Sequence, residues 1–129
     1  ELSTATYRDN SISVGGKYNI QMESKTVVSG IKKTFYHIVD ANNEPVYEDI
    51  ALFESAMAII KGLMINKKIN VDRVVELDSK YASQLSEAAI YKQKAKTITE
   101  SHRRDLALTK QSVAYDKMKQ LKSQIKRFL

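Results

Sequence analysis

The feature that most constrains the fold is the absence of helix-breaking residues from the second half of the chain. Residues 71–129 contain neither glycine nor proline, whereas the four glycines and the only proline of this 129-residue chain lie before residue 63. Glycine and proline are the residues that most disfavour a helix interior. One unbroken helix over residues 71–129 would be ~88 Å long at about 1.5 Å per residue, too long for a compact domain of this size. We therefore expect one or two long helices in this segment.

The apolar residues of this segment fall into two seven-residue registers that differ in phase. The first is Val74, Tyr81, Ala88 and Ala95, with Leu77, Tyr91 and Ile98 beside it; the second is Ala107, Ala114, Leu121 and Phe128, with Met118 and Ile125 beside it. The phase slips between Ile98 and Ala107, which indicates a break or a local change of supercoiling. Thr97 and Glu100 have capping-box spacing, so we slightly favour two helices over one. Narrow stripes of this kind are typical of helices that pack on partner helices.

The first half of the chain has the pattern of a small antiparallel β unit. Residues 1–16 have no helical period and are expected to form an extended arm or a short edge strand that ends at Gly15 and Gly16. Alternating apolar residues and turn chemistry predict strands at 17–22 and 33–39, a short β-prone piece at 26–29, a turn at 40–45, and a returning strand at 46–47 that completes a hairpin over 34–47.

A packing helix follows the β unit. It is predicted over residues 50–66, with Asp49 as its cap, and the connector after it ends at Asn70, which is expected to cap the next helix. The main apolar stripe of the packing helix indicates a core face. We expect its side chains at Phe53, Met57, Ile60 and Met64 to be largely buried.

These elements predict an α+β, helix-dominated fold. Its parts are an extended N-terminal arm, a small antiparallel β unit, a packing helix, and one or two long C-terminal helices. We divide the chain into the arm at residues 1–16, the β unit with its packing helix at 17–70, and a long basic helical segment at 71–129.

The positive charge is concentrated in the helical segment. The formal net charge is +6; residues 1–70 hold eight basic and eight acidic side chains, whereas residues 71–129 hold thirteen basic and seven acidic side chains. A basic segment of this kind attracts anionic partners, either nucleic acid or an acidic protein surface. The other interpretation is a solvated face on a structural helix.

Several classes of chemistry lack support in the sequence. The chain has no cysteine, which excludes disulfides, thiolate catalysis and cysteine-based zinc sites. No apolar run approaches the ~20 residues that a membrane span needs. His37 is expected to be a packed or surface side chain and Asp78 a helix-surface charge. Gly16 and Lys17 lack the other residues of a phosphate-binding loop. We therefore expect no catalytic residue, metal ligand, cofactor or small-molecule substrate, and no membrane partner.

Two groups of residues in the helical segment are candidate interaction sites. The predicted basic face consists of Lys92, Lys96, Arg103, Arg104, Lys119, Lys122, Lys126 and Arg127. The predicted apolar stripe consists of Met118, Leu121, Ile125 and Phe128.

The arm, the hairpin and the long lysine-rich helix, in a chain rich in Lys, Asn and Ile, resemble minor head or neck proteins of tailed bacteriophages. The resemblance covers the general character of the whole chain, contains no diagnostic motif and assigns no functional residue. It implies a virion protein whose basic helix faces packaged DNA or an acidic shell surface.

We expect a non-enzymatic structural or assembly protein of a larger complex, such as a virion, acting through its arm and long helices. Its expected partners are other protein subunits, including copies of itself, in a virion or the cytoplasm. The alternative is a nucleic-acid-binding accessory protein that uses the basic C-terminal helix.

Overall fold

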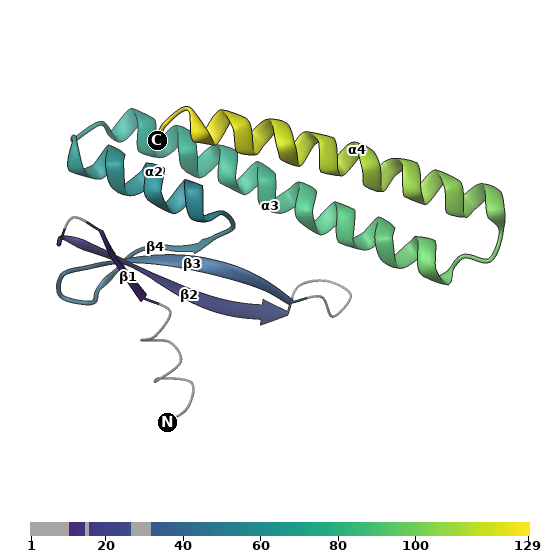
Figure 1. The fold of residues 1–129 in the computed structure, drawn as a ribbon, viewed down its shortest axis with the longest axis horizontal. Helices are drawn as coiled ribbons and strands as arrows, with labels where there is room; N and C mark the ends of the chain where they lie inside the picture. Colours follow the sequence, from purple (N-terminus) through teal and green to yellow (C-terminus); the bar gives the residue numbers. More distant parts are fainter. Residues whose placement is uncertain (1–10, 15, 27–31) are drawn as a thin grey trace, which may run out of the picture.

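The computed structural model describes residues 11–14, 16–26 and 32–129, which form a sheet followed by helices (Figure 1). The elements are β1 (Ser11–Val14), β2 (Tyr18–Thr26), β3 (Lys32–Asp40), β4 (Pro45–Ile50), α2 (Phe53–Met64), α3 (Lys68–Thr97) and α4 (Ser101–Lys126). The strands form one antiparallel sheet in the order β1-β2-β3-β4. The predicted α+β, helix-dominated class is confirmed.

The helices lie on one side of the sheet. In Figure 1, α2 lies between the sheet and the long helices, and α3 and α4 form an antiparallel hairpin whose far end extends away from α2. We call the sheet with α2 the body, and the half of the α3–α4 hairpin that contains the connection between its helices the distal half.

The β unit follows the predicted plan with longer strands. The turn between β3 and β4 uses the expected chemistry: the Asp40 side chain accepts hydrogen bonds from the N–H groups of Asn42 and Glu44, both at 2.9 Å. Within the predicted arm, residues 11–14 form the edge strand β1 and residues 1–10 lie outside the described residues. The predicted β-prone piece at 26–29 is described only at Thr26, which ends β2. The division into three domains stays a prediction.

The core joins all layers. Ile20 and Ile38 lie opposite each other on β2 and β3 and are fully buried against α2. Val74 and Leu77 of α3 and Ile125 of α4 belong to the same cluster, so the start of α3 and the end of α4, which lie at one end of the hairpin, both contribute to the core of the body. A fully buried aliphatic side chain contributes roughly 1.5–3 kcal/mol through removal from water.

The slip in the seven-residue pattern corresponds to a break between two helices. Residues 98–100 connect α3 to α4, which confirms the two-helix interpretation. The two apolar registers face each other, and Ala88, Ala114 and Met118 form a second buried cluster between them. The predicted capping box is wrong: α4 has no side-chain cap, and the Thr97 hydroxyl instead donates to carbonyls of its own helix.

The start of α2 also differs from the prediction. The helix begins at Phe53, not at residue 50, and Asp49 lies in β4 with a φ of 57° instead of acting as its cap. The N–H groups of Ala51 and Leu52 donate to the two carboxylate oxygens of Asp78 in α3, at 2.9 and 3.1 Å. Asp78, which we expected on the surface, is only 6% exposed. The periodicity of a segment does not predict that its N–H groups are capped by a carboxylate on another helix.

The buried face of α2 is rotated away from the predicted stripe. Its small residues Ser55, Ala58 and Gly62, spaced three and four apart, are buried, and this spacing lets α3 approach closely. Of the four predicted core residues, Ile60 is buried and Phe53 and Met57 are half-buried. Met64 is 47% exposed, so that prediction is wrong: it is the last residue of α2, where the chain leaves the core for the connector to α3.

Gly62→Ala tests this close approach. An added Cβ would lie 2.6 Å from Val71 Cγ2, closer than carbon atoms can pack. Overpacking of this kind costs about 1–3 kcal/mol, more than the ~1 kcal/mol that alanine gains over glycine in a helix. We expect a lower free energy of unfolding in a urea titration. The double variant with Val71→Ala should lose less than the sum of the two single losses; a Gly62→Ala protein more stable than the parent would contradict the close contact.

Asp78→Ala should destabilise the protein by about 1–3 kcal/mol for each backbone N–H left buried and unpaired.

Burial raises the pKa of Asp78 above 3.8, against the opposing hydrogen bond from the N–H of Ala51. The folded protein therefore holds a proton that the unfolded chain has released, so this carboxyl stabilises less as pH rises from 3.8 through its folded pKa. Urea titrations should show the parent losing stability relative to Asp78→Asn over that window, and a pH-independent difference would refute the shift.

Candidate functional site

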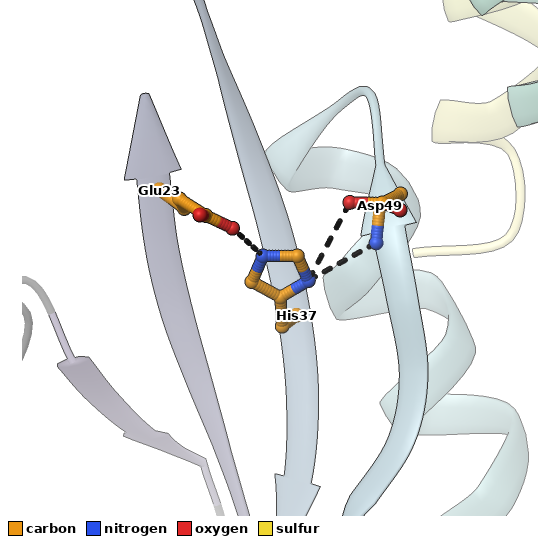
Figure 2. A group of neighbouring side chains, drawn as sticks. All are labelled: Glu23, His37 and Asp49. Carbon is orange, nitrogen blue, oxygen red and sulfur yellow. Dashed lines mark hydrogen bonds and ion pairs between the residues drawn. The ribbon is translucent and has the colours of Figure 1, made fainter. Parts of the chain in front are cut away.

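A cluster of polar side chains on β2, β3 and β4 surrounds His37 (Figure 2). His37 is 7% exposed, and its Nε2 lies 2.8 Å from Oε1 of Glu23. Its Nδ1 accepts the backbone N–H of Asp49 at 3.1 Å. Because Nδ1 accepts, the neutral ring carries its proton on Nε2 and donates it to Glu23. Both ring nitrogens are therefore engaged in hydrogen bonds.

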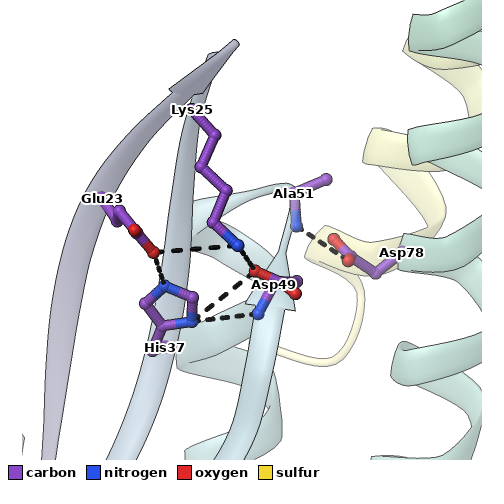
Figure 3. A network of polar contacts seen from close by, with 6 residues as sticks. All are labelled: Glu23, Lys25, His37, Asp49, Ala51 and Asp78. Atoms are coloured by element: carbon purple, nitrogen blue, oxygen red, sulfur yellow. Dashed lines mark hydrogen bonds and ion pairs between the residues drawn. The ribbon is translucent and has the colours of Figure 1, made fainter. Parts of the chain in front are cut away.

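Lys25 completes this cluster (Figure 3). Its ammonium group binds the Asp49 carboxylate and lies 3.8 Å from that of Glu23. The hydrogen bond to Asp49 raises the pKa of Lys25. Glu23, His37 and Asp49 are residue types that bind divalent metals, and their ligand atoms lie within 4.8 Å of one another. A metal would have to displace both Lys25 and the Nε2 proton, so we interpret the cluster as a polar network that joins three strands.

Sequence analysis predicted a packed or surface position for His37 and did not predict its partners. His37 is packed, as expected. It lies opposite Gln21 on β2, and Glu23 is the diagonal neighbour two residues further along that strand. A β-bulge in β4, where residues 47–50 oppose 36–38, directs the Asp49 N–H toward the ring. Strand register would identify Glu23, whereas no sequence signal identifies the bulge.

The structure divides the predicted basic face into two groups. The distal group lies at the end of α3 and the start of α4, beside the connection between them, and consists of Lys92, Lys96, Arg103 and Arg104. The proximal group lies on the last turns of α4 and consists of Lys119, Lys122, Lys126 and Arg127. The antiparallel hairpin places these two groups at opposite ends of α4, so they do not form one continuous site.

Few of these basic side chains are neutralised within the chain. Among the described residues, ion pairs involving the eight reach only Arg103, 3.9 Å from Glu100, and Lys122, 3.6 Å from Glu54 of α2. In the distal half, Lys94 and Lys110 approach the Tyr91 ring from α3 and α4, each 5.4 Å from its centroid. Stacking of cations on an aromatic face partly offsets their mutual repulsion. The distal half therefore presents positive charge together with an aromatic surface.

The predicted apolar stripe lies against its own chain. Met118 and Ile125 are buried, and Leu121 and Phe128 are half-buried beside the core of the body. In this fold the stripe therefore supplies packing between α4, α3 and α2, and only Leu121 and Phe128 keep part of their surface exposed.

Other apolar side chains of the distal half are exposed instead. They are Ile90, Leu106, Leu108, Val113 and Tyr115, with exposed fractions between 40% and 52%. The pairs Leu106/Val113 and Leu108/Tyr115 are each seven residues apart, so each pair follows one line along α4. The two lines flank the buried seam residues Ala107 and Ala114 on opposite sides. The seven-residue registers contained only residues of the seam, so they did not predict these two exposed lines.

Comparisons with protein-family models, curated proteins and solved structures return no match to this chain. Among the described residues, no helix has the combined length and apolar character needed to cross a membrane.

Proposed function

We propose that this chain is a non-enzymatic structural protein that assembles with other protein subunits, including copies of itself, through the distal half of its α3–α4 hairpin. The observation that carries the proposal is the pair of exposed apolar lines, Leu106/Val113 and Leu108/Tyr115, on two flanks of α4. Exposed apolar lines on both flanks let one hairpin contact a neighbour on each side, as helices do in bundles.

The basic side chains of the distal half shape this association. Like charges on neighbouring copies repel each other, so self-association is opposed at low ionic strength and favoured when salt screens the charges. An acidic surface on a different subunit would neutralise them directly. A virion assembly of the kind that the phage resemblance implies is the setting we propose, with the cytoplasm as the site of assembly.

The experiment is a sedimentation-equilibrium measurement of mass at low and high salt. We expect the mass to rise with protein concentration, and more at high salt. Leu106→Ser with Val113→Ser should lower the mass at a given concentration, because both changes remove apolar surface from one of the two flanks. A monomeric parent at concentrations up to about 1 mM, where any association would be weaker than roughly −4 kcal/mol, would contradict self-assembly.

Nucleic-acid binding is the second candidate, and the scarcity of ion pairs on the basic residues supports it. From Lys92 onward, only Arg103 and Lys122 have an acidic partner within 4 Å among the described residues. The apparent affinity for duplex DNA would fall with salt by a slope of about 0.9 for each phosphate contacted. The sign of the salt dependence thus separates the two functions.

A DNA titration with two charge-reversed triples tests this second candidate. The distal triple is Lys92→Glu, Lys96→Glu and Arg104→Glu, and the proximal triple is Lys119→Glu, Lys122→Glu and Lys126→Glu. Both change the net charge equally. If the distal half binds phosphates, the distal triple should weaken binding at least tenfold more than the proximal triple. Equal losses would indicate non-specific attraction, and a parent that does not bind would exclude this function.

A further inference from the structure

A groove runs between α3 and α4 at the end of the hairpin that packs on the body. It consists of two neighbouring hollows of about 500 and 290 Å³. Gln120 and Gln124 line both hollows, so the two are continuous. On α3 the lining extends from Arg73 to Gln84, which corresponds to roughly 16 Å at about 1.5 Å per residue. Three turns of a further helix would occupy this length.

Basic and apolar side chains line the groove together with serine and glutamine side chains. The basic side chains are Arg73 and Lys80 on α3 and Lys117 and Arg127 on α4. Leu77, Leu121 and Phe128 supply the apolar atoms between them. No acidic side chain of the described chain lines either hollow.

The two walls differ in how far their charges are compensated. On α3, Glu76 forms ion pairs with both Arg73 and Lys80. On α4, Lys117 and Arg127 have no acidic partner within 4 Å among the described residues. The uncompensated charge is therefore on the α4 side of the groove. Within the groove lining, Oε1 of Gln84 is buried and has no hydrogen-bond partner among the described residues.

We propose that this groove binds an acidic amphipathic helix of a partner protein. A third helix laid between two antiparallel helices completes a three-helix bundle, and its apolar face would cover the exposed parts of Leu121 and Phe128. Carboxylates on its flank would pair with Lys117 and Arg127, the two groove cations that have no acidic partner within 4 Å among the described residues. The groove lining shares no residue with the apolar lines Leu106/Val113 and Leu108/Tyr115, so the proposal does not depend on self-assembly.

The experiment uses a fluorescent synthetic peptide as the probe. The peptide carries leucines at helical spacing i, i+4, i+7 and i+11 with glutamates on both flanks, and a scrambled peptide of the same composition is its control. Binding is followed by fluorescence anisotropy. We expect saturable binding of the amphipathic peptide and at least tenfold weaker binding of the scrambled one.

Two double variants locate the binding site. Lys117→Glu with Arg127→Glu alters the groove, whereas Lys119→Glu with Lys126→Glu changes the net charge equally on α4 residues that do not line it. We expect the first to weaken peptide binding at least tenfold and the second to change it less than twofold. All four positions are exposed, and circular dichroism with thermal unfolding confirms that each variant is folded.

The lack of cysteine allows a direct test of position. Ser123→Cys places a thiol in the groove lining, and Ser112→Cys places one elsewhere on exposed α4. The peptide should protect the first thiol from alkylation and leave the second reactive. Any one of four results would overturn the proposal. Two concern the peptide: equal losses of binding in the two double variants, or equal binding of the scrambled peptide. The other two are tighter binding of duplex DNA through the same groove residues and an unprotected thiol at position 123.

Discussion

The arrangement of body and hairpin depends on the contacts of one carboxylate. Asp78 reaches from α3 to the N–H groups of Ala51 and Leu52, where the sheet ends and α2 is about to begin (Figure 3). The ammonium group of Lys33 donates to the carbonyl of the same Ala51 at 2.7 Å, so both polar groups of that peptide segment are held by charged side chains. Both charges lie in a partly dehydrated environment, and this burial lowers the pKa of Lys33 and raises that of Asp78.

Close packing turns this junction into a rigid attachment. The small face of α2 allows α3 to approach until Gly62 meets Val71, and Ile125 brings α4 into the same core. The body therefore anchors one end of a long hairpin. At the other end, which extends away from α2, α3 and α4 pack against each other along their seam. An anchored helical hairpin with exposed apolar and basic side chains is suited to holding subunits together, which is the role we propose. The two proposed contacts use different residues of α4, so one chain can bridge two partners.

Sequence periodicity predicted the parts of the fold that depend on local pattern. The two registers predicted both long helices and the seam between them, and the alternation around Phe35 and Ile38 predicted the central strands. Long-range polar contacts were not predictable from local pattern. Asp78, for example, accepts hydrogen bonds from two residues that precede it by 26 and 27 positions in the sequence. The rotation of α2 was missed for a related reason: Ser55, Ala58 and Gly62 are unremarkable in hydrophobicity, and their burial follows from the path of α3. Seven of the eight residues of the predicted basic face are exposed and Lys122 is half-buried against α2, and their role in binding stays a prediction. Their division into two groups requires the hairpin geometry.

The rigid attachment of the hairpin to the body is the central claim, and a distance measurement tests it directly. Spin labels would be attached at Ser24→Cys on β2 and Ser101→Cys at the start of α4, since the chain has no other cysteine. Pulsed electron paramagnetic resonance would then report the distance between the sheet and the far end of the hairpin. The account predicts a single narrow distance distribution in the parent, unchanged by salt, that broadens in the Asp78→Ala protein while its helical content is retained. A broad or multiple distribution in the parent would show that the hairpin moves relative to the body and would contradict the account.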